Sequence, residues 1–298
     1  MTLKYAEQTA IITELGATLR SYYVGKRPVV LSFDPLEVCP HSQGQILAPW
    51  PNRLRDGKYS FDGEEIEVPV NEKKNNNAIH GFFCWQKFRI DSVTENSCLL
   101  TLDSLPLPWY PYHVLFQVEY MLSQNGLSVK SYVKNEGDKR LPFALGFHPY
   151  LVSGEYSIDD CKLTIPAKKR LLTDSRQIPV DEIDVGDTDY DFSNAAKSRY
   201  IEGLVLDDCF FDLESAEEGQ WSAVLESPMG EKTILWADSV FGYIMCYTAD
   251  HIGINSRRAI AIEPMTAPPN ALATGKGLII LNPQTSWQAN YGINPCIN

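Results

Sequence analysis

The feature that most constrains this chain is a run of alternating apolar and polar residues interrupted by a tight-turn dipeptide. In FQVEYMLSQNGLSVKSYV, four apolar residues alternate from Phe116 to Leu122, and Val129, Ser131 and Val133 continue the alternation beyond Asn125-Gly126. A period of two places successive side chains on opposite faces of a β-strand. Asn-Gly readily adopts the positive φ angles of a tight hairpin turn. The segment therefore predicts a β-hairpin.

Similar patterns recur along the chain. KYSFDGEEIEVPV places Asp62-Gly63 between two short alternating runs, and WSAVLESPMGEKTILWAD repeats the pattern around Pro228-Met229-Gly230. The segment RRAIAIEP predicts a strand that ends at Pro264, because proline cannot donate to a β-ladder. The Asp-rich stretch from Thr173 to Ser198 predicts a long surface loop.

The distribution of glycine and proline along the chain favours an all-β fold. Nineteen glycines and nineteen prolines separate short segments, and no long helical periodicity, linker or internal repeat is evident in the 298 residues. Hydrophobic residues make up 44% of the chain, which is enough for a substantial core. We therefore expect one domain over residues 1–298, a large antiparallel β-sandwich.

Charge and cysteine content limit the partners. The net charge of −12 argues against nucleic acid and, more weakly, against anionic membranes and strongly anionic substrates, although a local basic pocket can override it. We see no secretory signal and no apolar run near the length of a membrane span. The seven cysteines are scattered without a CxxC pair, which is typical of reduced thiols in a cytoplasmic protein.

Five short segments carry residues capable of chemistry, and each also has a purely structural interpretation. Arg53 is also explained as a surface residue, His80 and His148 as hydrogen-bonded core residues, and Glu263 as the end of a strand. If the strand around Asp207-Asp208 alternates, one of the two acids faces inward, where it needs a partner or caps a turn. The segments are APWPNRLRDGKY (Asn52, Arg53), NNNAIHGFFCW (His80), ALGFHPYL (His148), LVLDDCFFDL (Asp207, Asp208) and IAIEPMTAPPNAL (Glu263).

Together these residues would supply a general acid, a general base and fixed hydrogen-bond donors in a polar cleft. A metal site is disfavoured because HxH and HExxH patterns are absent, so no metal is expected. No GxSxG is present, and no cysteine lies in an evident activating context, which disfavours nucleophilic catalysis.

These segments identify a resemblance to a known family. PWPNRLRDGKYSFDG, NAIHGF, GFHPYL, LDDCF and IEPMTAPPNAL occur in the order and at the intervals seen in the aldose 1-epimerase (mutarotase) family, from about residue 40 to about residue 275. The resemblance implies a large β-sandwich with an open cleft for a hexose. It also implies an isomerase that needs no cofactor, because mutarotation transfers neither electrons nor a group.

The resemblance also implies roles for individual residues. Glu263 corresponds to the general base and His148 to the general acid, with nearby carboxylates expected to help keep the imidazole protonated. Other residues would hold the sugar. They are Asn52, Arg53, His80 and Asp207, with Asp208 as the fallback if the register is shifted by one residue.

Several positions depart from the galactose-type pattern, and they leave the substrate open. Phe82 follows NAIHG, Met265 stands where glutamine is common, and Pro269 replaces a small residue. A sugar-binding or regulatory protein without catalysis is one alternative. A mutarotase for a phosphorylated or sulfonated hexose is another, with a basic patch from Arg53, Arg55, Lys73 and Lys74. The oligomeric state, monomer or homodimer, stays open.

Aromatic residues beside the motifs are candidates for stacking on a sugar. Trp50, Phe82 and Tyr150 adjoin the motif segments, and each is equally explained by core packing. The sequence therefore predicts a small-molecule sugar as the ligand but leaves the stacking surface undecided.

Overall fold

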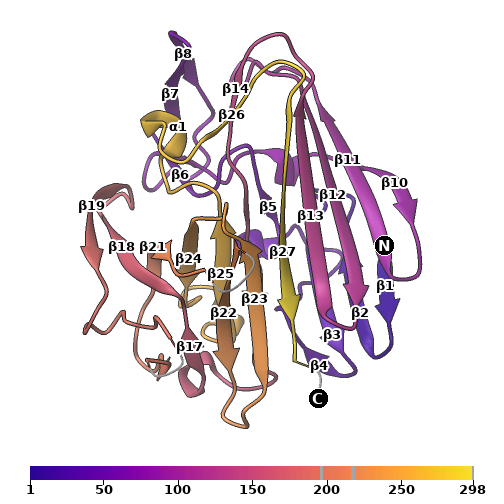
Figure 1. Cartoon of the computed structure of the whole chain (residues 1–298), viewed down its shortest axis with the longest axis vertical. Helices are drawn as coiled ribbons and strands as arrows, with labels where there is room; N and C mark the ends of the chain where they lie inside the picture. Colours follow the sequence, from indigo (N-terminus) through magenta and orange to yellow (C-terminus); the bar gives the residue numbers. More distant parts are fainter. Residues whose placement is uncertain (195–196, 216–218, 297–298) are drawn as a thin grey trace.

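The computed structural model describes residues 1–194, 197–215 and 219–296, and most of its regular structure is antiparallel β-sheet. Within these residues, two large sheets dominate, one of nine strands and one of eight. Figure 1 shows the long strands β11, β12, β13 and β27 running side by side along the longest axis of the molecule. The predicted all-β class and large antiparallel β-sandwich are confirmed.

The nine-stranded sheet is built on the central hairpin that the sequence predicts. Its strands, in spatial order, are β10 (Arg89–Val93), β11 (Ser97–Ser104), β12 (Val114–Ser123), β13 (Gly126–Asn135), β27 (Ser286–Asn294), β23 (Lys232–Asp238), β22 (Gln220–Glu226), β17 (Lys162–Thr164) and β20 (Arg199–Tyr200).

The eight-stranded sheet gathers segments that are far apart in the sequence. Its strands, in spatial order, are β19 (Pro179–Asp184), β18 (Ala167–Thr173), β21 (Asp207–Leu213), β24 (Tyr243–Tyr247), β25 (Ile260–Met265), β15 (Gly146–Phe147) and β5 (Ile46–Leu47), with β16 (Tyr150–Leu151) also paired to β25.

Smaller elements complete the described fold. They are the sheet of β1 (Thr2–Tyr5), β2 (Gln8–Ile12), β3 (Leu19–Val24) and β4 (Arg27–Pro28); the pairs β6 (Arg53–Arg55) with β9 (Asn77–Ile79), β7 (Lys58–Phe61) with β8 (Glu64–Glu67), and β14 (Leu141–Phe143) with β26 (Ile279–Leu281); the helix α1 (Ala271–Thr274); and the 3₁₀ turns η1 (Pro40–Ser42), η2 (Phe83–Trp85), η3 (Ile158–Asp160) and η5 (Gly253–Asn255).

The predicted hairpins form, although one turn differs in detail. Strands β12 and β13 pair from Ser123 opposite Gly126, but only Gly126 of the Asn125-Gly126 dipeptide has a positive φ, +92°. The loop is formed by Gln124 and Asn125, and Gly126 is already the first residue of β13. A Cβ on Gly126 would approach the carbonyl oxygen of Ile293 in β27 to 2.3 Å, so the neighbouring strand also requires a glycine there. At Asp62-Gly63 both residues have the positive φ that the dipeptide predicts.

Two predictions from the sequence were wrong. Strand β25 continues through Pro264 to Met265, for a reason that the site geometry explains below. The stretch from Thr173 to Ser198 contains an edge strand, β19, paired with β18. Most β19 side chains are exposed, so no apolar alternation announces the strand. Residues 195–196 of that stretch lie outside the described residues.

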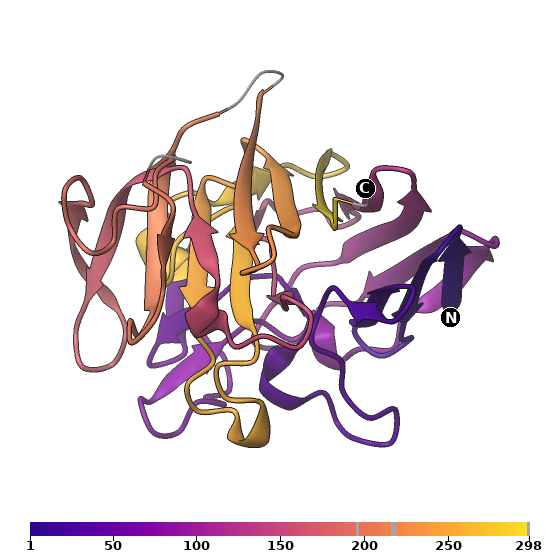
Figure 2. The same ribbon diagram turned by 90° about the horizontal axis from the view of Figure 1, so that it is seen from below.

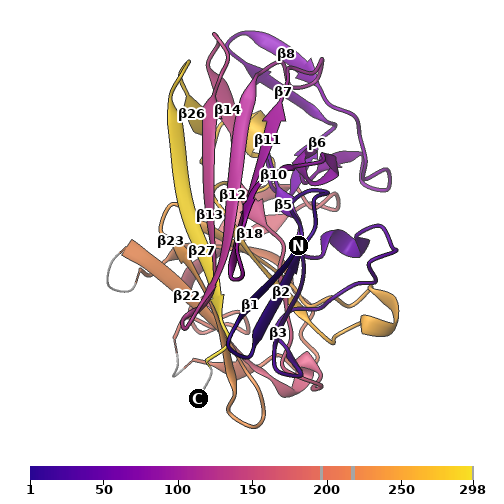
Figure 3. The same cartoon turned by 90° about the vertical axis from the view of Figure 1, so that its right-hand side faces the viewer.

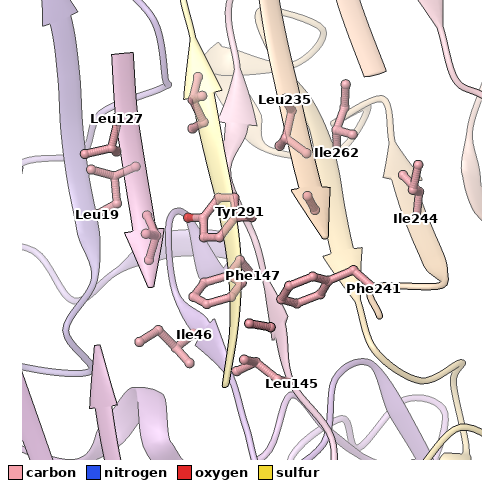
Figure 4. Close-up of a cluster of buried hydrophobic side chains, with 14 of the residues drawn as sticks. Leu19, Ile46, Leu127, Leu145, Phe147, Leu235, Phe241, Ile244, Ile262 and Tyr291 are labelled. Carbon is pink, nitrogen blue, oxygen red and sulfur yellow. The ribbon is translucent and has the colours of Figure 1, made fainter. Parts of the chain in front are cut away.

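The core lies between the two large sheets. Figure 4 shows Phe147 of β15, Tyr291 of β27 and Phe241 meeting there, together with Leu235 and Ile262. The ring centroids of Phe147 and Tyr291 are 4.2 Å apart. Burial of each such side chain contributes about 1.5–3 kcal/mol. This packing fixes which face of β15 and β25 points inward and which points away.

Two loops project side by side from one side of the molecule. They carry η1 and η5, which appear in purple and orange at the bottom of Figure 2 and on the right of Figure 3. The same loops supply His41 and His251 to a cleft. This side of the structure is therefore where a functional site is to be sought.

Replacing Gly126 by Ala tests whether β27 dictates the glycine in the hairpin. Gly63 is the matched control, because its φ is +82° but no heavy atom lies within 4 Å of the place that a Cβ would take there. The left-handed conformation alone costs about 1–2 kcal/mol. We expect Gly63→Ala to cost that much and Gly126→Ala about 1–3 kcal/mol more. Urea unfolding measures both, and equal costs would contradict the role of β27.

Candidate active site

A cleft of about 410 Å³ brings the six candidate residues together. Four of the five histidines of the chain line it. The lining residues are His41, Ser42, Asn52, Arg53, Asn71, Glu72, Ile79, His80, His148, Tyr150, Asp207, Tyr247, His251 and Glu263. A larger cavity of about 790 Å³ beside β18 and β19 has none of the six candidates among its described lining residues, so the chemistry is concentrated in the smaller cleft.

Sheet register places His148 opposite Glu263. Gly146 of β15 pairs with Met265 of β25, and Tyr150 of β16 pairs with Ala261 of the same strand. Because both pairs have the same antiparallel register, the residues midway between them face each other. His148 Nε2 accordingly lies 3.2 Å from Glu263 Oε1.

Pro264 explains why the ladder is interrupted at this point. The N–H of Ile262 donates to Pro149 O and the N–H of Thr266 donates to Leu145 O, so the missing N–H of Pro264 falls between them. The backbone of His148 faces the other side and continues the register of β15 with β5, with its N–H donating to Gln45 O at 3.0 Å. Proline is thus tolerated inside β25 because its missing donor faces the break between β15 and β16.

Asn52 and His80 lie opposite each other at one end of the β6–β9 pair and hold each other. The Asn52 N–H donates to His80 Nδ1 at 3.2 Å, and the His80 N–H donates to Asn52 O at 3.0 Å. Since Nδ1 accepts, the neutral His80 ring carries its proton on Nε2. Its ring lies edge-on to that of His148, with centroids 5.3 Å apart. His80 is therefore a fixed donor beside the acid–base candidates.

Arg53 lies between two carboxylates. Its Nε donates to both carboxylate oxygens of Glu72, at 3.0 and 3.2 Å. Its Nη2 is 3.8 Å from Asp207 Oδ2, which is an ion pair but too long for a hydrogen bond. Asn270 positions the strand that carries Arg53, because its N–H donates to Arg53 O at 2.6 Å.

The structure separates the two adjacent acids of β21. Asp207 lines the cleft, and its cross-strand partner Tyr247 lines it too. Asp208 accepts a hydrogen bond from Arg170 at 2.6 Å and is absent from the described lining of the cleft. Alternation along the strand sends the two side chains to opposite faces. Burial raises the pKa of Asp207, and the Arg53 guanidinium opposes that rise.

Burial favours the neutral forms of both His148 and Glu263. It lowers the pKa of His148 to about 3 and raises the pKa of Glu263 well above its usual value. The lowered pKa of His148 is contrary to the expectation that nearby carboxylates keep it protonated, because desolvation by burial is the largest cause of the shift.

Each side chain of the His148–Glu263 pair has one polar atom without a hydrogen-bond partner in the described part of the protein. Within the described residues, His148 Nδ1 and Glu263 Oε2 are buried without a hydrogen bond. The imidazole is 5% exposed and the glutamate 2% exposed. Such groups are costly to leave unpaired, so they are suited to a polar ligand or to proton transfer.

Sequence reasoning missed several cleft residues. Glu72, Tyr247 and His251 had no distinguishing pattern, although a cross-strand partner for Asp207 identifies Tyr247 once the β21–β24 pairing is known. Among the stacking candidates, Tyr150 lines the cleft and stacks on His148 with centroids 4.9 Å apart. Trp50 and Phe82 instead pack in a small core cluster with Leu272.

Comparison with known proteins identifies the family of the chain. The model of the family described as aldose 1-epimerase matches residues 1–294. The chain belongs to the aldose 1-epimerase family. The uncharacterized protein YihR of Escherichia coli (strain K12) is 29% identical over 283 residues, which cover 94% of this chain and 88% of that protein.

Two solved structures share the fold. The GalM/aldose epimerase homologue from C. elegans superposes with a TM-score of 0.86 at 18% identity, covering 100% of this chain and 99% of that one. Galactose 1-epimerase from Lactobacillus acidophilus NCFM superposes with a TM-score of 0.81 at 21% identity, covering 98% and 93%. Membership of the family supports an isomerase.

Two searches of the described residues bear on other kinds of site. No group of three or more His, Cys, Asp or Glu side chains in the described part of the chain is arranged to hold a metal ion. Over the same residues, no helix has the length and apolar character needed to cross a membrane.

Stability should depend on pH through His148. Its folded pKa is near 3, against an ordinary value of 6.5, so below pH 6.5 the unfolded chain binds a proton here that the folded chain does not. A group whose pKa is lowered by folding stabilises the folded state at pH values above its unfolded pKa. This stabilisation is lost as the pH falls toward the folded pKa. We expect the free energy of unfolding of the wild type to fall more steeply between pH 6.5 and 4.5 than that of His148→Asn. Urea unfolding at several pH values measures this, and parallel curves would contradict it.

Proposed function

We propose that this protein is an aldose 1-epimerase that interconverts the α and β anomers of a hexose or a close derivative. The observation that carries the proposal is the contact of 3.2 Å between His148 Nε2 and Glu263 Oε1 on a cleft wall that also bears Arg53, His80 and Asp207. A buried acid–base pair beside fixed donors is the arrangement that ring opening of a sugar requires.

The reaction is two proton transfers and one bond rotation. The Glu263 carboxylate takes the proton of the C1 hydroxyl while the His148 imidazolium gives a proton to the ring oxygen, and the C1–O5 bond breaks. The product is an open-chain aldehyde that rotates about C1–C2. The ring recloses on the other face as the protons return. Each positioned transfer contributes roughly 10²–10⁴-fold in rate.

Burial favours neutral His148 and protonated Glu263 in the free cleft, so the reactive form needs one internal step. The proton crosses from Glu263 to His148 along their direct contact. A bound sugar favours the resulting ion pair because its hydroxyl donates to the carboxylate, and a hydrogen bond to the charged form stabilises that form. Solvent exchange is not required for the transfer.

The remaining cleft residues hold the sugar. Arg53 and His80 donate near C1 and the ring oxygen, Asn52 fixes His80, and Asp207 accepts from a hydroxyl farther along the ring. Tyr150 and Tyr247 line the same cleft, with ring centroids 6.5 Å apart and nearly perpendicular planes. The ring of Tyr150 or Tyr247 would then contact the C–H face of the sugar.

The basic patch proposed for a charged sugar has little support. Arg55 is paired with Asp174, and Arg53 is engaged by Glu72. Lys73 and Lys74 are exposed and absent from the described lining of the cleft. A neutral sugar is the better candidate. A binding protein without catalysis is disfavoured because both proton carriers are present and in contact.

Replacing Glu263 by Gln tests the catalytic proposal. The amide keeps the shape of the side chain but cannot take the C1 hydroxyl proton, so we expect kcat to fall about 10²–10⁴-fold. Polarimetry of freshly dissolved α-D-glucose and α-D-galactose measures the rate. Near-normal rates in the variant would contradict the role of Glu263. Sugar binding without any acceleration by the wild type would favour the binding protein.

The adjacent acids offer a matched pair of variants. Asp207→Asn should raise KM at least about tenfold with a smaller change in kcat, because it weakens a contact made by substrate and transition state alike. Asp208→Asn should leave both constants near the wild-type values and lower the free energy of unfolding by about 1–3 kcal/mol, since Arg170 loses its partner. Steady-state polarimetry and urea unfolding distinguish the two, and reversed effects would overturn the assignment of Asp207 to the cleft.

A further inference from the structure

The carboxylate of Glu72 is held more firmly than an ordinary surface acid. Besides the two hydrogen bonds from Arg53 Nε, Oε1 accepts from Asn75 Nδ2 at 3.2 Å and Oε2 accepts from Asn77 Nδ2 at 2.8 Å. The Glu72 side chain is 19% exposed. Four hydrogen-bond contacts, in which the single Arg53 Nε–H is shared between both oxygens, fix the position of this carboxylate.

A second loop locks the segment that carries these donors. Arg176, from the turn between β18 and β19, donates from Nε to Asn75 O at 2.8 Å and from Nη2 to Asn76 O at 2.7 Å. Asn77 Nδ2 in turn donates to Arg176 O at 3.0 Å. This cross-bracing spans about 100 residues of sequence and fixes Glu72 relative to the cleft.

Glu72 determines which nitrogen atoms of the Arg53 guanidinium face the cleft. The carboxylate occupies the Nε edge of the guanidinium, so the terminal nitrogens remain for other partners. Nη2 lies on the side of Asp207 but at 3.8 Å does not hydrogen-bond to it. Arg53 is therefore bonded to one acid, Glu72, and faces a second, Asp207.

We propose that Glu72 is a positioning residue that also sets specificity, holding Arg53 in place and cancelling its charge so that the cleft selects an uncharged sugar over one bearing a phosphate or sulfonate. The inference rests on the proposed function only in taking a sugar as the ligand. An unopposed guanidinium is a strong site for such anions. With two carboxylates against one guanidinium, an incoming anion meets net repulsion, which is strongest where water is excluded.

The test uses D-glucose and D-glucose 6-phosphate as probes in calorimetric binding to the full chain. The Glu72→Gln variant keeps the volume of the side chain and one carbonyl acceptor but loses the charge. The ratio of the two dissociation constants, compared between variant and wild type, cancels any steric effect of the phosphate. We expect Glu72→Gln to shift this ratio at least about tenfold toward the phosphorylated sugar.

Two further variants separate charge from position. Glu231→Gln removes one negative charge at a partly exposed side chain that pairs with Arg27, and it should leave the ratio unchanged. Glu72→Asp keeps the charge but shortens the side chain, so it should preserve selection against the phosphate while weakening glucose binding. A purely structural role for Glu72 would instead weaken both sugars equally.

The results that would contradict the role of Glu72 differ from those that would contradict the proposed catalytic activity. An unchanged ratio in Glu72→Gln, tighter binding of the phosphorylated sugar by the wild type, or no binding of glucose by the wild type would each overturn the inference. A wild-type protein that binds glucose selectively but does not accelerate mutarotation would overturn the proposed function and leave the role of Glu72 intact.

Discussion

The alternation of side chains across the eight-stranded sheet is the constraint on which the cleft depends. Phe147 and Ile262 point into the core, where they pack with the facing sheet, and this packing sends His148 and Glu263 to the other side. A slip of one residue in either segment would exchange the two faces and bury the acid–base pair in the core. The hydrophobic core and the cleft are therefore two results of a single register.

An interruption in the hydrogen-bond ladder lies beside the pair. Pro264 has no N–H, and its position falls between the bonds that Ile262 and Thr266 donate to Pro149 O and Leu145 O. The backbone of His148 bonds on the other side, to the segment 44–45. Burial disfavours the charged form of both His148 and Glu263.

The polar side of the cleft comes from elements outside the paired strands that carry His148 and Glu263. The β6–β9 pair supplies Arg53 and, at one end, Asn52 and His80, while β21, which is separated from β25 by β24 in the same sheet, supplies Asp207. Both contributions depend on long-range contacts, such as the Arg176 bonds to the loop that holds Glu72. The acid–base centre thus belongs to one rigid sheet, whereas most of the sugar-holding groups are brought to it by braced loops.

The sequence by itself determined the all-β class, the main hairpins and the identity of six residues that line one cleft, because short-range alternation and family motifs encode them. It did not reveal β19, whose exposed side chains show no alternation, or the passage of β25 through Pro264. Only the tertiary structure decided that Asp207 and not Asp208 faces the cleft, that His148 touches Glu263, and that Glu72 engages Arg53. These contacts join residues that are far apart in the sequence, and their distances follow from sheet register and core packing, which local sequence does not specify.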